Sequence, residues 1–171
     1  MALIKTVRGK TPQYGKECFF AENATLIGEV LMGDQCSVWY NAVVRADVNS
    51  IQLGNRVNVQ DGAVIHCTFQ KAATQIGDDV SIGHNAIVHG CTIKERVLIG
   101  MGAIVMDHAV IESNCLIAAG AVVLQSSHLK SGYIYAGIPA KPIKPLSEAL
   151  QKGEIERIAA NYIQYASWYK E

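Results

Sequence analysis

Three of the chain's five histidines, His66, His84 and His89, fall within one stretch, VIHCTFQKAATQIGDDVSIGHNAIVHGC. Imidazole is a common zinc ligand, and a site of three neutral imidazoles leaves one coordination position for water, as in catalytic centres. Such an ion lowers the pKa of its water to about 7, so that metal-bound hydroxide is available at neutral pH. CO₂ is a natural electrophile for it, and Fe²⁺ or Co²⁺ could use the same ligands. The alternative is that these are surface histidines in turns.

A six-residue repeat covers most of the chain and decides where these histidines lie. Each unit opens with an aliphatic residue and has a small residue in fifth place, in runs that begin at Leu26, Leu53, Ile76 and Ile93. A β-sandwich alternates with a period of two, whereas a period of six suits a short strand and a tight turn, with glycines supplying the turns. Three units close one triangular coil of about 18 residues, and coils stack about 4.8 Å apart. The repeat therefore predicts a mainly β fold, a parallel β-helix.

The repeat also suggests how the chain is organised. We expect a single domain over residues 1–171, with β-helix coils over residues 12–138. The register of the repeat slips by five residues at HCTFQKAATQ, which predicts a loop that bulges out of the coils. The glycines and prolines of SGYIYAGIPAKPIKP are expected to end the repeat as an extended connector.

A helix is expected over residues 147–170, packed antiparallel along one flat face of the coils. Among its tyrosines, Tyr162 is the candidate to reach the metal site. The apolar stripe of this helix consists of Ile155, Ile158, Ala159, Tyr162, Tyr165, Ala166 and Tyr169.

The repeat places two of the histidines side by side. His66 and His89 hold the second place of units one coil apart, and Arg45 holds that place one coil earlier. Two histidines about 5 Å apart on adjacent strands can share a metal ion. His84 is third in its unit, with Asp61 one coil below it, and leaves from another face. We therefore expect a homotrimer in which His84 of one subunit faces His66 and His89 of the next.

Composition narrows the classes of partner and compartment. The formal net charge is +0 at pH 7, so neither nucleic acid nor a membrane surface is expected as a partner. No apolar run approaches the ~20 residues of a transmembrane helix, and MALIKTVRGK lacks the apolar core of a signal peptide. The scattered cysteines favour a reducing cytoplasm over a disulfide framework. We expect Cys67, which follows His66, to be a small buried thiol, and Cys36 and Cys115 to lie in the core.

At this point the chain resembles the γ-class carbonic anhydrase-like family of hexapeptide-repeat proteins. The likeness lies in VVRADVNSIQLGNRVNVQDGAVIH, SIGHNAIVHGC, IGMGAIVMDHAVIE and AGIPAKPIK, and it covers nearly the whole chain. It implies a left-handed β-helix, a homotrimer with zinc or iron at each subunit interface, and reversible hydration of CO₂ to bicarbonate. It also implies that His66, His84 and His89 are the metal ligands.

The same resemblance suggests roles for the residues around the metal. Gln60 resembles the residue that orients the bound water or bicarbonate, and Asp61 its structural neighbour. Arg45 and Asp47 resemble the pair that joins subunits near the anion, although an ordinary interface ion pair is the alternative. The family's well-studied enzymes carry proton-moving acidic residues where this chain has Val48 and in the loop where it has CTFQKAATQ. Every CO₂ hydration must release a proton, so the reaction is expected to be slow.

Two other functions remain open. An acyl-CoA thioesterase or acyltransferase is the first, because hexapeptide-repeat trimers often bind coenzyme A and AGIPAKP occurs in that superfamily. The chain lacks the long protruding loop with an isolated catalytic histidine that acyl transfer would need. The second is a non-enzymatic, metal-binding trimeric subunit, which the missing proton-moving carboxylates favour.

Overall fold

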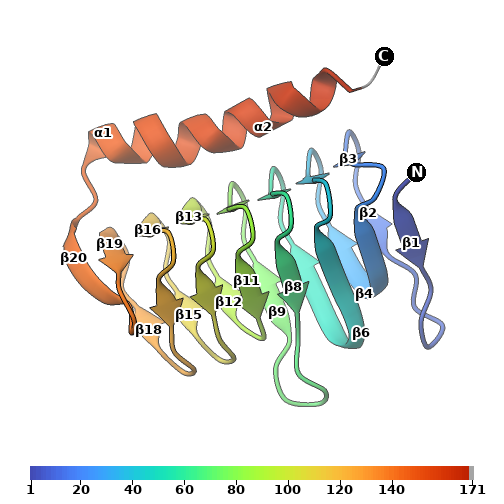
Figure 1. Cartoon of the computed structure of the whole chain (residues 1–171), viewed down its shortest axis with the longest axis horizontal. Coiled ribbons are helices and arrows are strands. Elements are labelled where there is room, and N and C mark those ends of the chain that lie inside the picture. Colours follow the sequence, from blue (N-terminus) through green and yellow to red (C-terminus); the bar gives the residue numbers. More distant parts are fainter. Residues whose placement is uncertain (170–171) are drawn as a thin grey trace.

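The hexapeptide repeat folds into a parallel β-solenoid of about seven turns, and a helix runs back along its outside (Figure 1). The structure is a computed structural model that describes residues 1–169. The predicted fold, a left-handed parallel β-helix of hexapeptide repeats with a C-terminal α-helix, is confirmed. No helix within the described chain is long and apolar enough to cross a membrane.

Each turn contributes short strands to three faces of a triangular prism. The helix face consists of β3 (Phe19–Phe20), β5 (Ser37–Val38), β7 (Asn58–Val59), β10 (Ser81–Ile82), β13 (Val97–Ile99), β16 (Cys115–Ile117), β19 (Tyr133–Ala136) and the antiparallel β20 (Lys141–Pro145). The histidine face consists of β1 (Leu3–Lys5), the first parts of β4 (Thr25–Met32) and β6 (Val43–Leu53), β8 (Val64–His66), β11 (Ile87–His89), β14 (Ile104–Val105) and β17 (Val122–Val123). The polar face consists of β2 (Gln13–Tyr14), the second parts of β4 and β6, β9 (Thr74–Ile76), β12 (Thr92–Ile93), β15 (Val110–Ile111) and β18 (His128–Leu129).

The interior of the prism is filled by the first and fifth places of the repeat. Leu26, Ile65 and Ile99 hold first places, and each is fully buried in one continuous core. Cys36 and Cys115 hold fifth places and are buried in the same core, as predicted. Burying an aliphatic side chain of this size contributes about 1.5–3 kcal/mol. The stacked aliphatic places therefore hold successive coils together.

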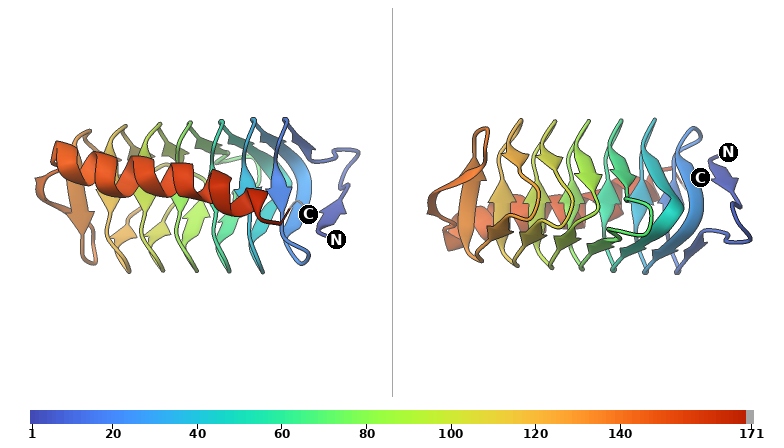
Figure 2. Two further views of the ribbon diagram at one scale, coloured as in Figure 1. Left: turned by 90° about the horizontal axis from the view of Figure 1, so that it is seen from above. Right: turned by 90° about the horizontal axis from the view of Figure 1, so that it is seen from below.

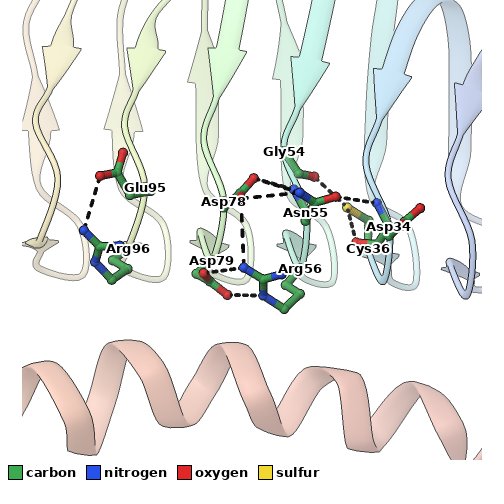
Figure 3. Close-up of polar contacts among 9 residues, drawn as sticks. All are labelled: Asp34, Cys36, Gly54, Asn55, Arg56, Asp78, Asp79, Glu95 and Arg96. Carbon is green, nitrogen blue, oxygen red and sulfur yellow. Dashed lines mark hydrogen bonds and ion pairs between the residues drawn. The ribbon is translucent and has the colours of Figure 1, made fainter.

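Glycine supplies some of the corners, as expected, such as Gly62 with a φ of 69°, and at other positions it makes room between coils. Several turns use a polar residue in the left-handed region, such as Asn85 with a φ of 56°. Gly54 is needed for space, because a Cβ there would lie 2.2 Å from Oδ1 of Asp78 and 2.8 Å from its backbone nitrogen. That carboxylate accepts a hydrogen bond from the backbone N–H of Asn55 at 2.7 Å, and Asn55 in turn accepts one from Asp34 at 2.9 Å (Figure 3). The glycine leaves room for a polar ladder that joins neighbouring coils.

The solenoid extends further at its N-terminal end than the repeat predicts. β1 pairs in parallel with β4, with Leu3 opposite Thr25, so the coils begin before residue 12. At the other end, the expected connector forms β20 and pairs antiparallel with β19. The loop predicted at HCTFQKAATQ does leave the coils between β8 and β9, closed by an isolated bridge between Thr68 and Ala72 (Figure 1).

The C-terminal helix runs along the solenoid from the last coils back toward the first ones, and it covers the helix face (Figure 2). It begins with α1 (Glu148–Leu150), passes through a π-helical segment η1 (Gln151–Glu156), and ends with α2 (Arg157–Ser167). Ile155, Ala159 and Ala166 of the predicted stripe are buried against the coils. The spacing of the apolar stripe did not predict the π-helical segment. Residue 170 of the predicted helix lies outside the described residues.

The close approach at Gly54 gives a test of how tightly the coils stack. Gly54→Ala is expected to lower the free energy of unfolding by about 1–3 kcal/mol, because the added Cβ forces the next coil away. Gly153→Ala, in η1, is the matched control, since a Cβ there meets nothing within 4 Å. It is expected to be neutral or to stabilise by up to about 1 kcal/mol. Urea unfolding measures both, and equal effects would contradict the close-approach argument.

Candidate metal centre

His66 and His89 end adjacent strands of the histidine face. They are paired in register between β8 and β11, as the repeat predicts, and their ring centroids lie 5.1 Å apart. Nδ1 of His66 is 3.0 Å from Nε2 of His89. With Zn–N distances of about 2.0–2.1 Å, two ligand atoms of a tetrahedral ion lie about 3.3 Å apart. The two imidazoles therefore fit two positions around one ion.

Asp47 holds the other side of the His66 ring. Its Oδ1 is 3.1 Å from Nε2 of His66, and its Oδ2 accepts a hydrogen bond from Arg45 at 2.6 Å. Burial opposes the charge of Asp47, but hydrogen bonds from Arg45 and His66 outweigh it and lower the pKa of Asp47 below its usual value. Burial also lowers the pKa of His66, with Arg45 adding to the effect and Asp47 opposing it. A neutral imidazole, which metal binding requires, is thereby favoured.

Asp107, which reasoning from the sequence missed, does for His89 what Asp47 does for His66. Its Oδ1 lies 2.5 Å from Nδ1 of His89, and its Oδ2 accepts a hydrogen bond from Thr68. Burial opposes its charge, but the hydrogen bonds from Thr68 and His89 lower the pKa of Asp107 below its usual value. A signal for it was present in the sequence: Met106 holds the place that stacks on His89, and the acidic Asp107 follows Met106 directly.

His84 lies apart from the other two histidines, in the turn between β10 and β11. Its Nδ1 is 3.0 Å from Oδ2 of Asp61, the residue expected one coil below it. Tyr162 of α2 brings its hydroxyl to 3.5 Å from Nε2 of His84, so this tyrosine does reach one of the candidate ligands. Burial, together with Asp61 and Tyr165, raises the pKa of Tyr162 to about 12. Within residues 1–169, no group of three or more His, Cys, Asp or Glu side chains is placed to hold a metal ion.

Gln60 lies at the end of β7 and is only 5% exposed. Its Nε2 donates to Oδ1 of Asn58 at 3.0 Å, and Nδ2 of Asn58 donates to Ser81 at 2.7 Å. This buried chain of hydrogen bonds fixes the orientation of the Gln60 amide. Cys67, next to His66, is buried and donates to a backbone carbonyl oxygen, and burial raises the pKa of its thiol. It is the small buried thiol that the sequence suggests.

Val48 and the loop after His66 lie beside the site. A cavity of about 300 Å³ is lined by Asp47, Val48 and Phe69, with the Arg8 guanidinium 5.7 Å from the centre of the Phe69 ring. Arg8, Val48 and Phe69 are apolar or cationic, and Asp47 is already occupied by Arg45 and His66. Neither Val48 nor the loop after His66 therefore supplies an acid, and the other carboxylate that lines the cavity, Glu29, is paired with Lys10 at 3.1 Å.

Comparison with known proteins agrees with the hexapeptide-repeat fold. The family "Bacterial transferase hexapeptide (six repeats)" matches residues 90–125. A protein from Geobacillus kaustophilus named carbonic anhydrase is 36% identical over 168 residues, which cover 98% of this chain and 91% of that protein. The chain belongs to the γ-carbonic anhydrase family. Gamma carbonic anhydrase 2, mitochondrial, from Arabidopsis thaliana is 37% identical over 95% of this chain, although the chain spans only 60% of that relative's length.

One solved structure extends the comparison to a second group of relatives. A hexapeptide transferase family protein from Anaplasma phagocytophilum superposes with a TM-score of 0.90 and is 35% identical, covering 98% of both chains. The same coils thus carry members of the γ-carbonic anhydrase family and proteins named as transferases, so the fold alone does not decide the chemistry.

The outward side chains differ sharply among the three faces of this family member. Those of the helix face lie under the helix, and those of the polar face include the exposed Gln52 and Gln75. The outward side chains of the histidine face form an aliphatic row that nothing in the described part of the chain covers. The members of this row are Val43, Val64, Ile87, Ile104 and Val122, paired in register. A continuous apolar row of this kind is typical of a protein–protein contact.

The lowered pKa of Asp47 predicts how stability depends on pH. A carboxylate with a lowered folded pKa stabilises the protein above its unfolded pKa, about 3.9, and this contribution is lost as the pH falls through the folded pKa. Asp47→Asn should therefore lower the free energy of unfolding at pH 7, and the difference from wild type should shrink below about pH 4. Urea unfolding at pH 7 and pH 3 measures it.

The matched control for that experiment is Asn49→Ala, close to Asp47, which changes no titratable group. Its difference from wild type should be the same at both pH values. A difference for Asp47→Asn that is equally independent of pH would contradict the assigned role of its charge.

Proposed function

We propose that the chain is a metal-dependent, γ-class carbonic anhydrase-like lyase that interconverts CO₂ and bicarbonate. The observation that supports this most strongly is common to the three histidines. One ring nitrogen of each lies against a carboxylate, from Asp47, Asp107 or Asp61. Histidines that bind metal are oriented in this way, because the carboxylate holds the N–H and leaves the other nitrogen as a ligand. When bound, Zn²⁺, or Fe²⁺ or Co²⁺ in its place, supplies the Lewis acidity that makes water acidic near neutral pH.

The proposed assembly is a homotrimer with one site at each interface. His66 and His89 supply two ligands from one subunit, and His84 of the neighbouring subunit supplies the third. This proposal is supported by the aliphatic row on the histidine face, which lies beside both histidines and needs a partner. A heterologous contact closed by threefold rotation gives three equivalent sites.

The other polar residues have distinct roles in this proposal. Gln60, held by its buried hydrogen bonds, presents a fixed amide to the reacting water or to bicarbonate. Arg45 keeps a partly exposed guanidinium beside Asp47 and attracts the bicarbonate anion. Asp61 orients His84. Position 48 and the loop after His66 supply no carboxylate to take the released proton, so we expect buffer molecules to carry it and turnover to be slow.

Two competing functions are outcomes of the same tests. The likeness to a hexapeptide transferase family protein keeps an acyl-CoA thioesterase or acyltransferase open. The loop over residues 67–73 is short and contains no histidine, which weighs against acyl transfer. A non-enzymatic trimeric subunit would bind metal without hydrating CO₂. We place the protein in the cytoplasm, because its cysteines are scattered and lack the paired spacing of a disulfide framework.

Stopped-flow hydration of CO₂ by metal-reconstituted protein tests the proposed reaction. Wild type is expected to hydrate CO₂ at a rate that rises with buffer concentration. His89→Ala should lose both bound metal and hydration activity, because one ligand is gone. His128→Ala is the matched control, since His128 pairs with Glu112 on an exposed surface. Retained metal and full rate in His89→Ala would contradict the ligand assignment, and hydrolysis of acyl-CoA instead of CO₂ hydration would favour the thioesterase.

Subunit mixing tests whether each site is shared. His84→Ala and His89→Ala should each be inactive and metal-poor alone, yet co-expressed mixed trimers should recover one intact interface each. The control mixes His66→Ala with His89→Ala, whose losses fall on the same side of every interface and recover nothing. Metal content and CO₂ hydration of doubly tagged trimers are measured. Equal recovery, or none, in both mixtures would rule out a third ligand from the neighbouring subunit.

A further inference from the structure

Asp107 joins two parts of the molecule that the repeat alone keeps separate. It lies in the turn between β14 and β15, one coil beyond His89. One carboxylate oxygen lies 2.5 Å from Nδ1 of His89, and the other accepts the hydroxyl hydrogen of Thr68 at 2.5 Å. Thr68 belongs to the loop that leaves the coils after His66. Both carboxylate oxygens are thus engaged, and the carboxylate has a single orientation.

The packing around Asp107 is arranged to let its side chain reach back to His89. A Cβ on Gly90 would lie 2.3 Å from Oδ1 of Asp107 and 2.8 Å from Cβ of Ala72, so only glycine leaves the path open. The backbone N–H of Gly90 also donates to the Thr74 hydroxyl, which donates to the carbonyl oxygen of His66. The carboxylate, the loop and the two histidine strands therefore form one hydrogen-bonded unit.

We propose that Asp107 is a positioning residue for His89, with Thr68 fixing the carboxylate. Accepting a hydrogen bond from Nδ1–H keeps the proton on that nitrogen and leaves Nε2 as the ligand atom. Nε2 is the atom that faces His66, 3.0 Å from its Nδ1. This inference rests on the proposed metal site, and it assigns His89 the same kind of support that Asp47 gives His66.

A second histidine–carboxylate pair provides the matched control. Glu112 lies 2.8 Å from Nε2 of His128 on the polar face, where the His128 side chain is 64% exposed. Within residues 1–169, neither side chain of this pair forms a hydrogen bond with another histidine. Glu112→Gln therefore removes the same kind of contact without touching the candidate site.

The experiment titrates metal-free protein with Co²⁺ alone and follows its absorption bands. Asp107→Asn is expected to bind Co²⁺ about 10–100-fold more weakly than wild type. Thr68→Val should give a smaller loss, because the carboxylate remains but its orientation is freer. Glu112→Gln should bind as wild type does. Equal affinity in wild type and Asp107→Asn would overturn the inference while leaving the proposed site intact, whereas no binding to wild type would overturn both.

A second readout does not depend on metal or activity. Nitrogen-15 NMR of labelled histidine in metal-free protein reports which ring nitrogen carries the proton. His89 is expected to be protonated on Nδ1 in wild type and to lose that preference in Asp107→Asn; an unchanged tautomer would overturn the inference. If Asp107→Asn does not fold, Thr68→Val decides: weaker Co²⁺ binding supports the inference, and unchanged binding overturns it.

Discussion

Parallel backbone hydrogen bonds join each coil to the next, so residues in the same place of the repeat lie on one another at about 4.8 Å. Every interaction at the candidate site follows from this spacing. It brings His66 and His89 into register on adjacent strands, although the loop that leaves the coils separates them along the chain. It also sets Asp61 beneath His84. A rigid lattice of columns suits a metal centre, because ligand atoms must be held within a few tenths of an ångström before the ion arrives.

The same spacing leaves little room between coils. Where a side chain must fit between two coils, the chain has a glycine, whose missing Cβ leaves the space. At Gly54 the missing Cβ admits the carboxylate of Asp78, which supports a corner of the scaffold. At Gly90 the missing Cβ admits the carboxylate of Asp107, which lies against His89. One packing device therefore provides both a structural ladder and the outer support of a candidate ligand. The two cases differ only in the residue that the carboxylate contacts, which is Asn55 for Asp78 and His89 for Asp107.

Interactions within one column were accessible from the sequence, and those that cross columns were not. Counting in sixes predicts that His66 meets His89 and that Asp61 lies below His84. The contact of Asp107 with His89 is diagonal, from the third place of one coil to the second place of another, and depends on a rotamer and on the space at Gly90. β1 was missed because Leu3 precedes any complete unit of the repeat. The π-helical segment was missed because a few residues of altered winding hardly change an apolar stripe.

The shape of the prism explains why such a site would be shared between subunits. Side chains on one flat face point in the same direction, so two ligands on that face converge, but a residue at a corner points away from them. His66 and His89 lie on a face, and His84 lies in the turn before it. Within residues 1–169, His84 forms no group with His66 and His89 that could hold an ion, whereas a neighbouring prism laid against the face would turn its corner toward the pair. The aliphatic row beside the histidines then gives that contact its hydrophobic drive, and the metal would add a bond that forms only when the neighbour is present.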